Sequence, residues 1–398
     1  MRPITAYLVV VPLRDMSGMF IAVTYARFLQ QIGLTNSQIT IINWSFAALM
    51  LLAQIPTGIF ADRYGRARSM KIGMTILTVG LFAYYWASGF WSAIALEGLL
   101  GVGVAFVCGA DQAWITAELN RQNRNEEIEK IFSTAQMICA VGALSAGFIG
   151  GLLGARDLRW PWLACGSLSL LALILACLFM PDPIRGSENP TKRGPSLTRQ
   201  SWKMFAGSRA LKWAVALPCV MALTIPYCHY QSLVFKSLAS GTALAWIWLP
   251  QFAPQLIGAY VMLRWRGKLA NGIGLMALAM TPFVGGSAMI CLGLAPCLIG
   301  KLSGAMSLEL TYGFQHPLLS AFVQRRVGEE YRATYGSLQA LIIGIWTTIL
   351  SIGVATTMAA RANGVPAICQ LWWQMGALML IGAVALFLWR PRAINDPS

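Results

Sequence analysis

Two charged side chains, Arg14 and Asp15, stand next to each other inside a run of apolar residues that extends from Ile4 to about Leu29. An ionised group at the centre of a bilayer costs about 2.5–3.5 kcal/mol, so such residues usually face a cavity or a partner of opposite charge. A carboxylic acid that is desolvated in one conformation and paired in another changes its proton affinity, and this change couples protonation to conformation. The pair therefore points to proton binding within a membrane protein.

The composition supports a membrane setting. Only 11% of the 398 residues are charged and 57% are hydrophobic, with a mean hydropathy of +0.61, whereas soluble chains carry about 25% charged residues. Apolar runs of roughly 20 residues, long enough to cross about 30 Å of hydrocarbon, recur along the whole chain. The sequence thus predicts an all-α integral membrane protein with twelve transmembrane helices, at 4–29, 39–60, 70–88, 92–118, 131–154, 161–180, 212–235, 240–263, 271–291, 296–323, 333–358 and 368–389.

A long polar segment from 181 to 210, rich in Pro, Ser, Lys and Arg, divides these spans into two groups of six. The division predicts an N-terminal half over 1–180, a basic linker over 181–210 and a C-terminal half over 211–398. Two such halves are expected to be related by an axis along the membrane normal, with a central site between them.

The formal charge of +15 follows from the predicted topology, since 23 of the 30 Lys and Arg residues fall on one side of the membrane. The positive-inside rule makes that side cytoplasmic and places both termini there. The excess of basic residues therefore sets the orientation and does not indicate nucleic-acid binding. We expect a multi-pass protein of a bacterial cytoplasmic (inner) membrane.

The stretch GIFADRYGRARSMK, residues 58–71, lies between the second and third spans and carries Gly58, Asp62, Arg63, Gly65 and Arg66. This pattern resembles the signature of the major facilitator superfamily, and the resemblance covers the whole chain. It implies the major facilitator fold, with two pseudo-symmetric halves around a central cavity, and a secondary transporter that works by alternating access. It also implies that these residues act as a latch at the cytoplasmic gate. Simple anchoring by positive charge is the alternative.

A second stretch, GALSAGFIGG at 142–151, resembles the antiporter motif of drug exporters, with Gly142, Gly150 and Gly151 in place. Ala146 stands where that motif has Gly, and Gly147 stands where it has Pro. Small residues at this spacing also allow close helix packing of any kind. Both an exporter motif and generic packing remain open.

A third pattern departs from the family in the fourth span. Glu97 precedes Gly101 and Gly103 at the position where the family has Arg, so a role of that Arg in proton transfer cannot be carried over. Glu97 is expected near the outer end of its helix. An interfacial acid that reaches water is an equal alternative to a functional role.

The resemblance further implies that spans one, four, seven and ten line the central cavity. The candidates for proton coupling there are Arg14, Asp15, Asp111, Gln112 and Glu309, and those for the substrate cavity are Tyr227, His229, Tyr230, Gln231, Tyr312, Gln315, Trp246 and Gln255. Arg14 and Asp111 are expected at matching depths, roughly 15 Å and roughly 11–14 Å from the cytoplasmic ends of their spans. Consecutive helical residues point about 100° apart, so we expect Arg14 to pair with Asp111 and to leave Asp15 for a proton or a substrate cation. A structural ion pair between the two spans is the alternative.

The predicted function is proton-coupled export of a small amphipathic compound, such as a drug or a secreted metabolite. Uptake by proton symport is the alternative within transport, and an intramembrane enzyme or a receptor is the alternative outside it. No HExxH, GxSxG or P-loop pattern and no His-rich metal cluster occurs in the sequence, which argues against an enzyme and an ATP-driven pump. We expect no cofactor, no metal, and a monomer whose partners are substrate, protons and lipid.

Overall fold

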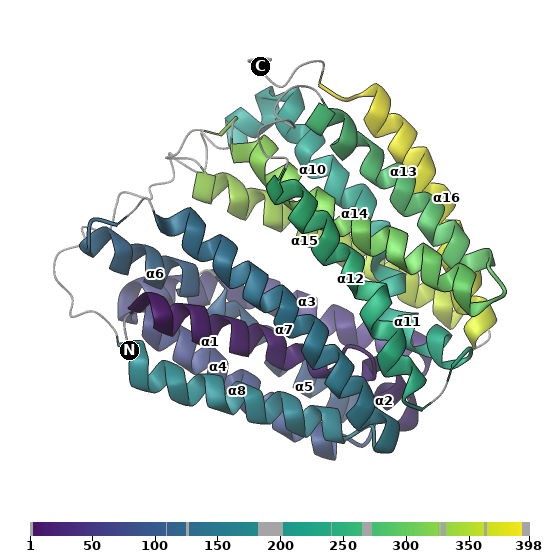
Figure 1. The fold of residues 1–398 in the computed structure, drawn as a ribbon, viewed down its shortest axis with the longest axis horizontal. Coiled ribbons are helices and arrows are strands. Elements are labelled where there is room, and N and C mark those ends of the chain that lie inside the picture. Colours follow the sequence, from purple (N-terminus) through teal and green to yellow (C-terminus); the bar gives the residue numbers. More distant parts are fainter. Residues whose placement is uncertain are drawn as a thin grey trace. The chain divides into compact units, whose positions relative to one another are not determined.

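The regular elements of the described residues are all helices in the computed structural model (Figure 1), which confirms the expected all-α class. The structure describes residues 3–108, 110–124, 127–181, 202–239, 241–264, 273–324, 326–327, 332–361 and 364–391. Contacts divide the chain into two compact units, namely unit 1 (1–186 and 235–249) and unit 2 (187–234 and 250–398). The division at a linker over 181–210 stays a prediction, because 182–201 lie outside the described residues.

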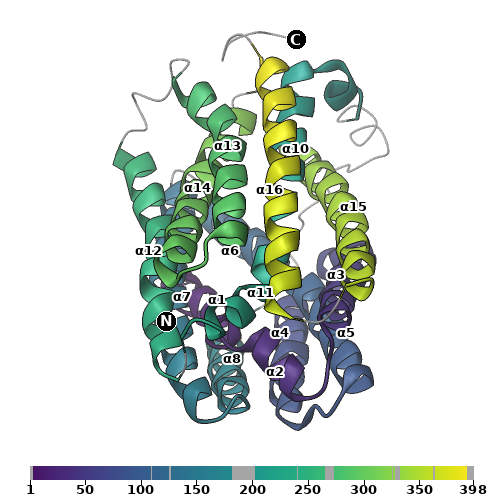
Figure 2. The ribbon, with the colours of Figure 1, turned by 90° about the vertical axis from the view of Figure 1, so that its right-hand side faces the viewer.

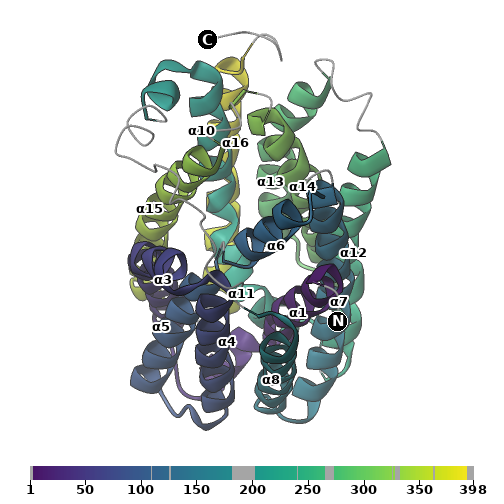
Figure 3. The ribbon, with the colours of Figure 1, turned by 90° about the vertical axis from the view of Figure 1, so that its left-hand side faces the viewer.

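Unit 1 is a bundle in which α5 packs against α3 and α4, α4 packs against α8, and α1 packs against α7 and α8 (Figure 3). Its helices are α1 (Pro3–Ser17), η1 (Gly18–Ile21), α2 (Tyr25–Gln31), α3 (Asn36–Tyr64), α4 (Arg66–Ala83), η2 (Tyr84–Trp86), α5 (Phe90–Val107), α6 (Ala110–Arg121), α7 (Ile128–Arg156) and α8 (Trp160–Phe179).

Unit 2 is built around α13, which packs against α14 and α16, while α10 packs against α15 and α16 (Figure 2). Its helices are α10 (Arg209–Met221), η4 (Ala222–Thr224), α11 (Ile225–Lys236), α12 (Ala243–Arg264), α13 (Ile273–Leu294), α14 (Leu298–Gln324), α15 (Arg332–Ala359) and α16 (Val365–Leu388). The last residues of α11 and the first of α12 belong to unit 1.

Each of the twelve predicted spans falls on a helix or on a run of helices. Eight of the described runs are long and apolar enough to cross a membrane. Spans 4–29, 92–118 and 212–235 each consist of more than one helical element. In the first of these, the hydroxyl of Ser17 donates to the carbonyl oxygen of Arg14 at 2.6 Å, a contact that competes with the helical ladder and commonly bends it.

Local sequence signals fix the ends of several helices. The hydroxyl of Thr35 accepts from the backbone N–H of Gln38, and the Gln38 side chain accepts from the backbone N–H of Thr35, so a capping box starts α3. Gly65, with φ of 115°, separates α3 from α4, a conformation that glycine adopts without strain. We call the end of unit 1 that holds this turn the Gly65 end.

Candidate functional site

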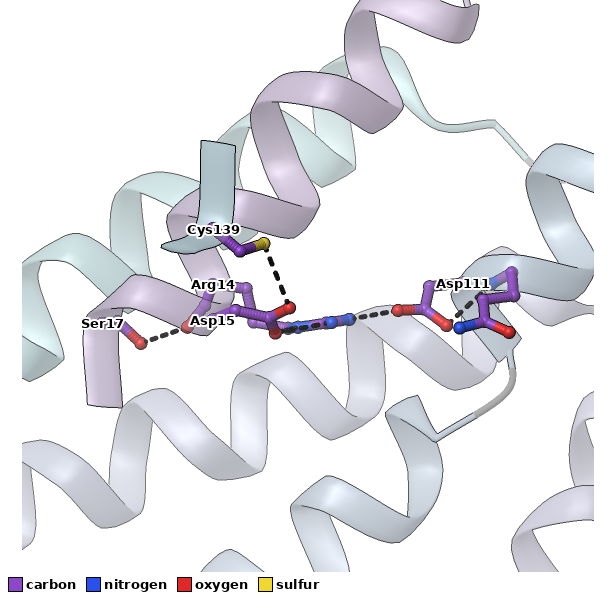
Figure 4. Close-up of polar contacts among 6 residues, drawn as sticks. Arg14, Asp15, Ser17, Asp111 and Cys139 are labelled. Carbon is purple, nitrogen blue, oxygen red and sulfur yellow. Dashed lines mark hydrogen bonds and ion pairs between the residues drawn. The ribbon is translucent and has the colours of Figure 1, made fainter. Parts of the chain in front are cut away.

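The polar side chains within the spans form two clusters, one in each unit, which we describe separately. The ion-pair cluster of unit 1 consists of Arg14, Asp15 and Asp111 (Figure 4). The Glu309 cluster of unit 2 consists of the hydrogen-bonded residues Tyr227, Gln231, Gln251 and Glu309. It also includes the hydrogen-bonded pair of Thr224 and Tyr312, because Tyr312 lies three residues after Glu309 on α14. The expected central cavity between the halves remains a prediction.

Helix periodicity explains why Arg14 points into unit 1. Tyr7, Val10 and Val11 are at most 5% exposed and form part of the apolar core of this unit. Arg14 lies three and four residues after Val11 and Val10, and therefore on the same face of α1. The buried face of α1 thus ends in a cation, which needs a partner of opposite charge.

Arg14 has two acidic partners. Its Nη1 donates to Asp111 Oδ2 at 2.9 Å, while its Nε donates to Asp15 Oδ1 at 2.8 Å and its Nη2 lies 2.6 Å from the same oxygen. The expected contact with Asp111 is present, but the expectation that Asp15 stays unpaired was wrong. The angle of about 100° between consecutive helical residues fixes only the directions of their Cβ atoms. The Arg14 side chain is long enough for Nε and Nη2 to contact the adjacent Asp15 while Nη1 contacts Asp111.

The helix ends favour this arrangement electrostatically. Arg14 lies in the last turn of α1 and Asp111 lies in the first turn of α6, so each charge has the sign that its helix dipole stabilises. The Asp111 Oδ1 also accepts from the backbone N–H of Gln112 at 2.7 Å. The side chain of Gln112 is exposed, so this residue contributes its backbone to the cluster.

The three charges of the cluster differ in their access to solvent. The side chains of Arg14 and Asp111 are 11% and 10% exposed, whereas that of Asp15 is 43% exposed. The thiol of Cys139, on α7, donates to Asp15 Oδ2 at 3.6 Å, as Figure 4 shows. Asp15 is therefore the acid of the cluster that a solute or a proton reaches most readily.

The Glu309 cluster surrounds a buried acid. Glu309 is 5% exposed, and Tyr227 Oη donates to its Oε1 over a long 3.5 Å. The amide of Gln251 donates to Tyr227 Oη at 2.7 Å and also to Gln231. Among the described residues, no basic side chain forms an ion pair with Glu309, so this carboxyl group lacks a compensating charge.

The helix break in unit 2 lies against this cluster. Thr224, in η4 between α10 and α11, is hydrogen-bonded to the hydroxyl of Tyr312. Pro226 follows at the second position of α11, where its missing N–H is not needed by the helix. The break therefore brings a hydroxyl group next to α14.

The remaining predicted cavity residues do not join the Glu309 cluster through a described contact. Trp246 is 61% exposed and its ring meets that of Phe148 at 4.9 Å, and Gln255 is exposed. Tyr230 is fully buried. His229 Nδ1 and Gln315 Oε1 are buried without a described hydrogen-bond partner.

The signature residues 58–66 lie at the Gly65 end. Arg66 Nη1 donates to the carbonyl oxygen of Ala113 on α6 at 2.9 Å. The guanidinium of exposed Arg63 stands 5.5 Å from the centre of the Tyr64 ring, and Gly58 is exposed within α3. Asp62 occupies the last turn of α3, and its side chain lies outside the described part. Their role as a latch stays a prediction.

The four glycines of the antiporter-like stretch lie on α7 and face two neighbours. A methyl group added at Gly142 would meet the side chain of Met16, and one added at Gly150 would meet the carbonyl oxygen of Phe20. Additions at Gly147 and Gly151 would meet Trp248 and Ala245 at the start of α12, both in unit 1. These contacts agree with a packing role.

Glu97 does not reach water, so the reading of an interfacial acid was wrong. The residue is 8% exposed and accepts a hydrogen bond from the hydroxyl of Tyr84. The Tyr84 ring stacks on that of Trp162 at 3.9 Å, and Phe28 packs against both rings. Phe28 of α2 thus packs against the two rings beside this acid.

Sequence reasoning missed several residues that contact the clusters. Thr224 and Trp372, whose ring lies 5.7 Å from that of Tyr227, are the clearest in unit 2, and Cys139 is the clearest in unit 1. The interruption of the seventh span near Pro218 and Pro226 was the available signal for Thr224. No group of three His, Cys, Asp or Glu side chains within the described ranges is placed to bind a metal.

The sequence model of the Major Facilitator Superfamily matches residues 8–351, which is most of the chain. The protein belongs to this superfamily. It is therefore a membrane transporter of a small molecule and not an enzyme.

Named relatives differ in how much of the chain they match. The chain is 25% identical over 376 residues to the vesicular acetylcholine transporter of Tetronarce californica, a match that covers 91% of this chain and 69% of that protein. It is 30% identical over 164 residues to the uncharacterized MFS-type transporter MJ1560 of Methanocaldococcus jannaschii, covering 41% and 42%. It is 24% identical over 180 residues to the quinolone resistance protein NorA of Staphylococcus aureus, covering 45% of each.

Among solved structures, that of the nucleoside transporter NupG superposes with a TM-score of 0.78 over 98% of this chain and 99% of that one, at 14% identity. This likeness shows the major facilitator fold and does not extend to the substrate.

Proposed function

We propose that the protein exports a small amphipathic organic compound by alternating access in exchange for protons. The observation that carries this proposal is the sharing of Arg14 between two acids, at 2.6 Å from Asp15 and 2.9 Å from Asp111. One guanidinium compensates the charge of one carboxylate, so the ion-pair cluster carries one negative charge that is not compensated.

The uneven burial of the two acids assigns their roles in the proposal. Asp111 is as buried as Arg14, and together they form a balanced pair, whereas Asp15 is 43% exposed. A proton on Asp15 would remove the surplus charge without leaving Arg14 unpaired, which avoids the large cost of an isolated buried ion. Asp15 is thus the coupling residue, and a substrate cation competes with the proton for the same charge.

Protonation would then bias the conformational equilibrium. A ligand shifts an equilibrium only by its differential affinity for the two states. The Asp15 carboxylate lies in the last turn of α1 before the break at η1, so a change of its contacts with Arg14 acts on a helix end and not on a continuous helix. Such a position allows a small change of charge to alter the backbone nearby.

The Glu309 cluster is the proposed second element of substrate recognition. It presents two tyrosines and two glutamines around one acid without a described cationic partner. Aromatic surface with a few placed polar groups is the usual lining of a small-molecule site. The cluster suits a compound that has both an apolar body and a polar or cationic group.

Two observations support export of an organic compound. The stretch 142–151 keeps three glycines of the antiporter motif, at Gly142, Gly150 and Gly151, and two relatives are named for acetylcholine and for quinolone resistance. A monomer in a bacterial cytoplasmic membrane, with both termini in the cytoplasm, completes the proposal.

The test is transport in proteoliposomes with a pH gradient imposed in either direction. Counterflow against a panel of organic cations, neutral drugs and metabolites identifies a substrate. Asp15→Asn should then abolish the response to the pH gradient while exchange without a gradient persists, since the amide keeps the shape of the carboxyl group and cannot titrate. Glu127→Gln, which removes a partly exposed acid that pairs with Arg124, is the charge-matched control and should behave as wild type.

Two results would contradict the proposal. Accumulation of substrate in the direction of the proton flux would indicate symport and reverse the assigned direction. A pH-gradient response that survives in Asp15→Asn would remove Asp15 from coupling and direct attention to Glu309.

A further inference from the structure

We propose that unit 1 carries a second binding site, specific for an anionic group, at the end opposite to the Gly65 end. A pocket of about 690 Å³ opens there between the end of α2, the end of α7 and Lys236. Its lining consists of Arg27, Gln30, Gln31, Gly154, Arg156, Asp157, Leu158 and Lys236. Small-molecule sites commonly have volumes of about 300–1,000 Å³, so the pocket has room for a small organic anion.

The charge of the lining is positive. The lining includes three basic residues, Arg27, Arg156 and Lys236, and one acid, Asp157. The structure describes no ion pair among these four residues. Gln30 and Gln31 add amide groups that are able to donate hydrogen bonds. Arginine is well suited to a carboxylate or a phosphate because its fork donates two parallel hydrogen bonds.

Arg27 gives the strongest indication of a missing partner. Its Nε and Nη1 are buried, and neither has a hydrogen-bond partner among the described groups. A buried donor on a charged group is costly when it remains unpaired. These two atoms are enclosed by the protein, so an anion in the pocket would compensate the charge of Arg27 and bond to the part of its side chain that lines the pocket.

The predicted topology argues against a merely orienting role for these residues. The basic residues that set orientation are concentrated on the Gly65 side of the membrane, where 23 of 30 fall under the predicted topology. The positive-inside rule depletes the other side. Three of the few basic residues outside that group nevertheless line one pocket, which indicates a local requirement for positive charge.

Asp157 restricts the positive charge of the site. Its Oδ1 accepts from the backbone N–H of Arg159 at 2.9 Å, so its carboxylate is held in place by the turn between α7 and α8. A fixed negative charge in the lining weakens the binding of an anion. Removal of this charge should therefore strengthen the binding of an anion, whereas removal of a basic residue of the lining should weaken it.

The anionic group has two chemically equivalent sources, a soluble carboxylate or phosphate and the phosphate of a phospholipid headgroup. The first test uses the full-length protein in a zwitterionic detergent, with inorganic phosphate and succinate as probes in isothermal titration calorimetry. The second uses nanodiscs of phosphatidylcholine with or without phosphatidylglycerol, with bound lipid counted by native mass spectrometry. Binding in the first test identifies a soluble ligand, and binding in the second alone identifies the lipid.

In either test Arg27→Gln should weaken binding about tenfold or more, the effect of losing one charge-assisted hydrogen bond. Arg156→Gln, at an exposed side chain, should act in the same direction and serves if the first variant folds poorly. Asp157→Asn should tighten binding. Arg159→Gln, which changes the charge at the same end outside the lining, should alter affinity by no more than about twofold.

The proposal is overturned if neither probe nor phosphatidylglycerol binds, or if Arg27→Gln and Arg156→Gln both bind as wild type. It is also overturned if Arg159→Gln weakens binding as much as they do, because the effect would then reflect net charge alone. These measurements require no transport, so their outcome is independent of the proposed proton-coupled export.

Discussion

Arg66 donates a hydrogen bond to the carbonyl oxygen of Ala113 at 2.9 Å, and this bond joins the Gly65 turn to α6. Ala113 lies two residues after Asp111, which accepts from Arg14. The signature turn and the ion-pair cluster are therefore attached to the same helical turn, so a movement of one is expected to be felt by the other.

Arg66→Gln should loosen this attachment and, with the latch role implied by the family, favour the inward-facing state. Asp62→Asn is expected to act in the same direction, because the family pattern assigns Asp62 to the same latch and an amide accepts weaker hydrogen bonds than a carboxylate. The measurement is the labelling of single cysteines placed on each side of the membrane in a cysteine-free background. Lys71→Gln, at the same end of unit 1, is the charge-matched control. Unchanged labelling in both variants would indicate that residues 58–66 act only as a positively charged membrane anchor and not as a latch.

Arg14→Gln and Asp111→Asn should differ in their effect on stability. Loss of Arg14 leaves two acids without a cation and should cost about 3–5 kcal/mol. Loss of the Asp111 charge leaves Arg14 paired with Asp15 and should cost about 1.5–3 kcal/mol, the value of one charge-assisted bond. Melting temperatures of both single variants and the double variant give the coupling free energy. Additive effects would mean that the two side chains do not interact in the membrane.

Gly150→Ala should destabilise the protein, because the added methyl group would overlap the carbonyl oxygen of Phe20, a backbone atom that cannot rotate away. Gly353→Ala is the matched control within α15, since nothing lies within 4 Å of the added atom there. That control should be neutral or stabilising by up to about 1 kcal/mol through helix propensity. Equal melting temperatures for both variants would argue against close packing along α7.

Tyr84→Phe should lower stability by about 1–3 kcal/mol, because it removes the hydrogen-bond donor to buried Glu97. Glu97→Gln should cost less, since the Gln carbonyl oxygen still accepts from the Tyr84 hydroxyl. Thermal unfolding in detergent compares the two variants at one pH. A larger loss for Glu97→Gln would indicate that the charge of Glu97 matters more than its hydrogen bond.

The fold could be predicted from the sequence because hydropathy and the positive-inside rule act on whole spans. Residues 58–71 and the spans together identified the superfamily, and each predicted span coincides with helical structure. The helix breaks after Ser17 and before Ile225 were missed because hydropathy is averaged over a whole span. One or two backbone groups that leave the helical hydrogen-bonding pattern do not change that average. Ser, Gly and Pro near these points were the local signals.

The site was less predictable, because side-chain reach is a tertiary property. The Arg14–Asp111 contact followed from matched depths along two helices. The contact with Asp15 depended on the rotamer of Arg14, and the burial of Glu97 depended on Tyr84 and Trp162, which are distant in sequence. Periodicity places a residue on a face, but it does not decide which of several acids a long cation selects.

The adjacency of Arg14 and Asp15 also bears on how the first span enters the membrane during synthesis. Asp111 follows Arg14 by 97 positions, so α1 is synthesised and inserted into the bilayer before α6 is synthesised. A lone arginine would raise the cost of inserting this span, whereas its neighbour already provides the counter-charge within the same helical turn. Asp15 therefore compensates the charge of Arg14 while the first span is inserted. The contact with Asp111 forms only after the fourth span has been synthesised.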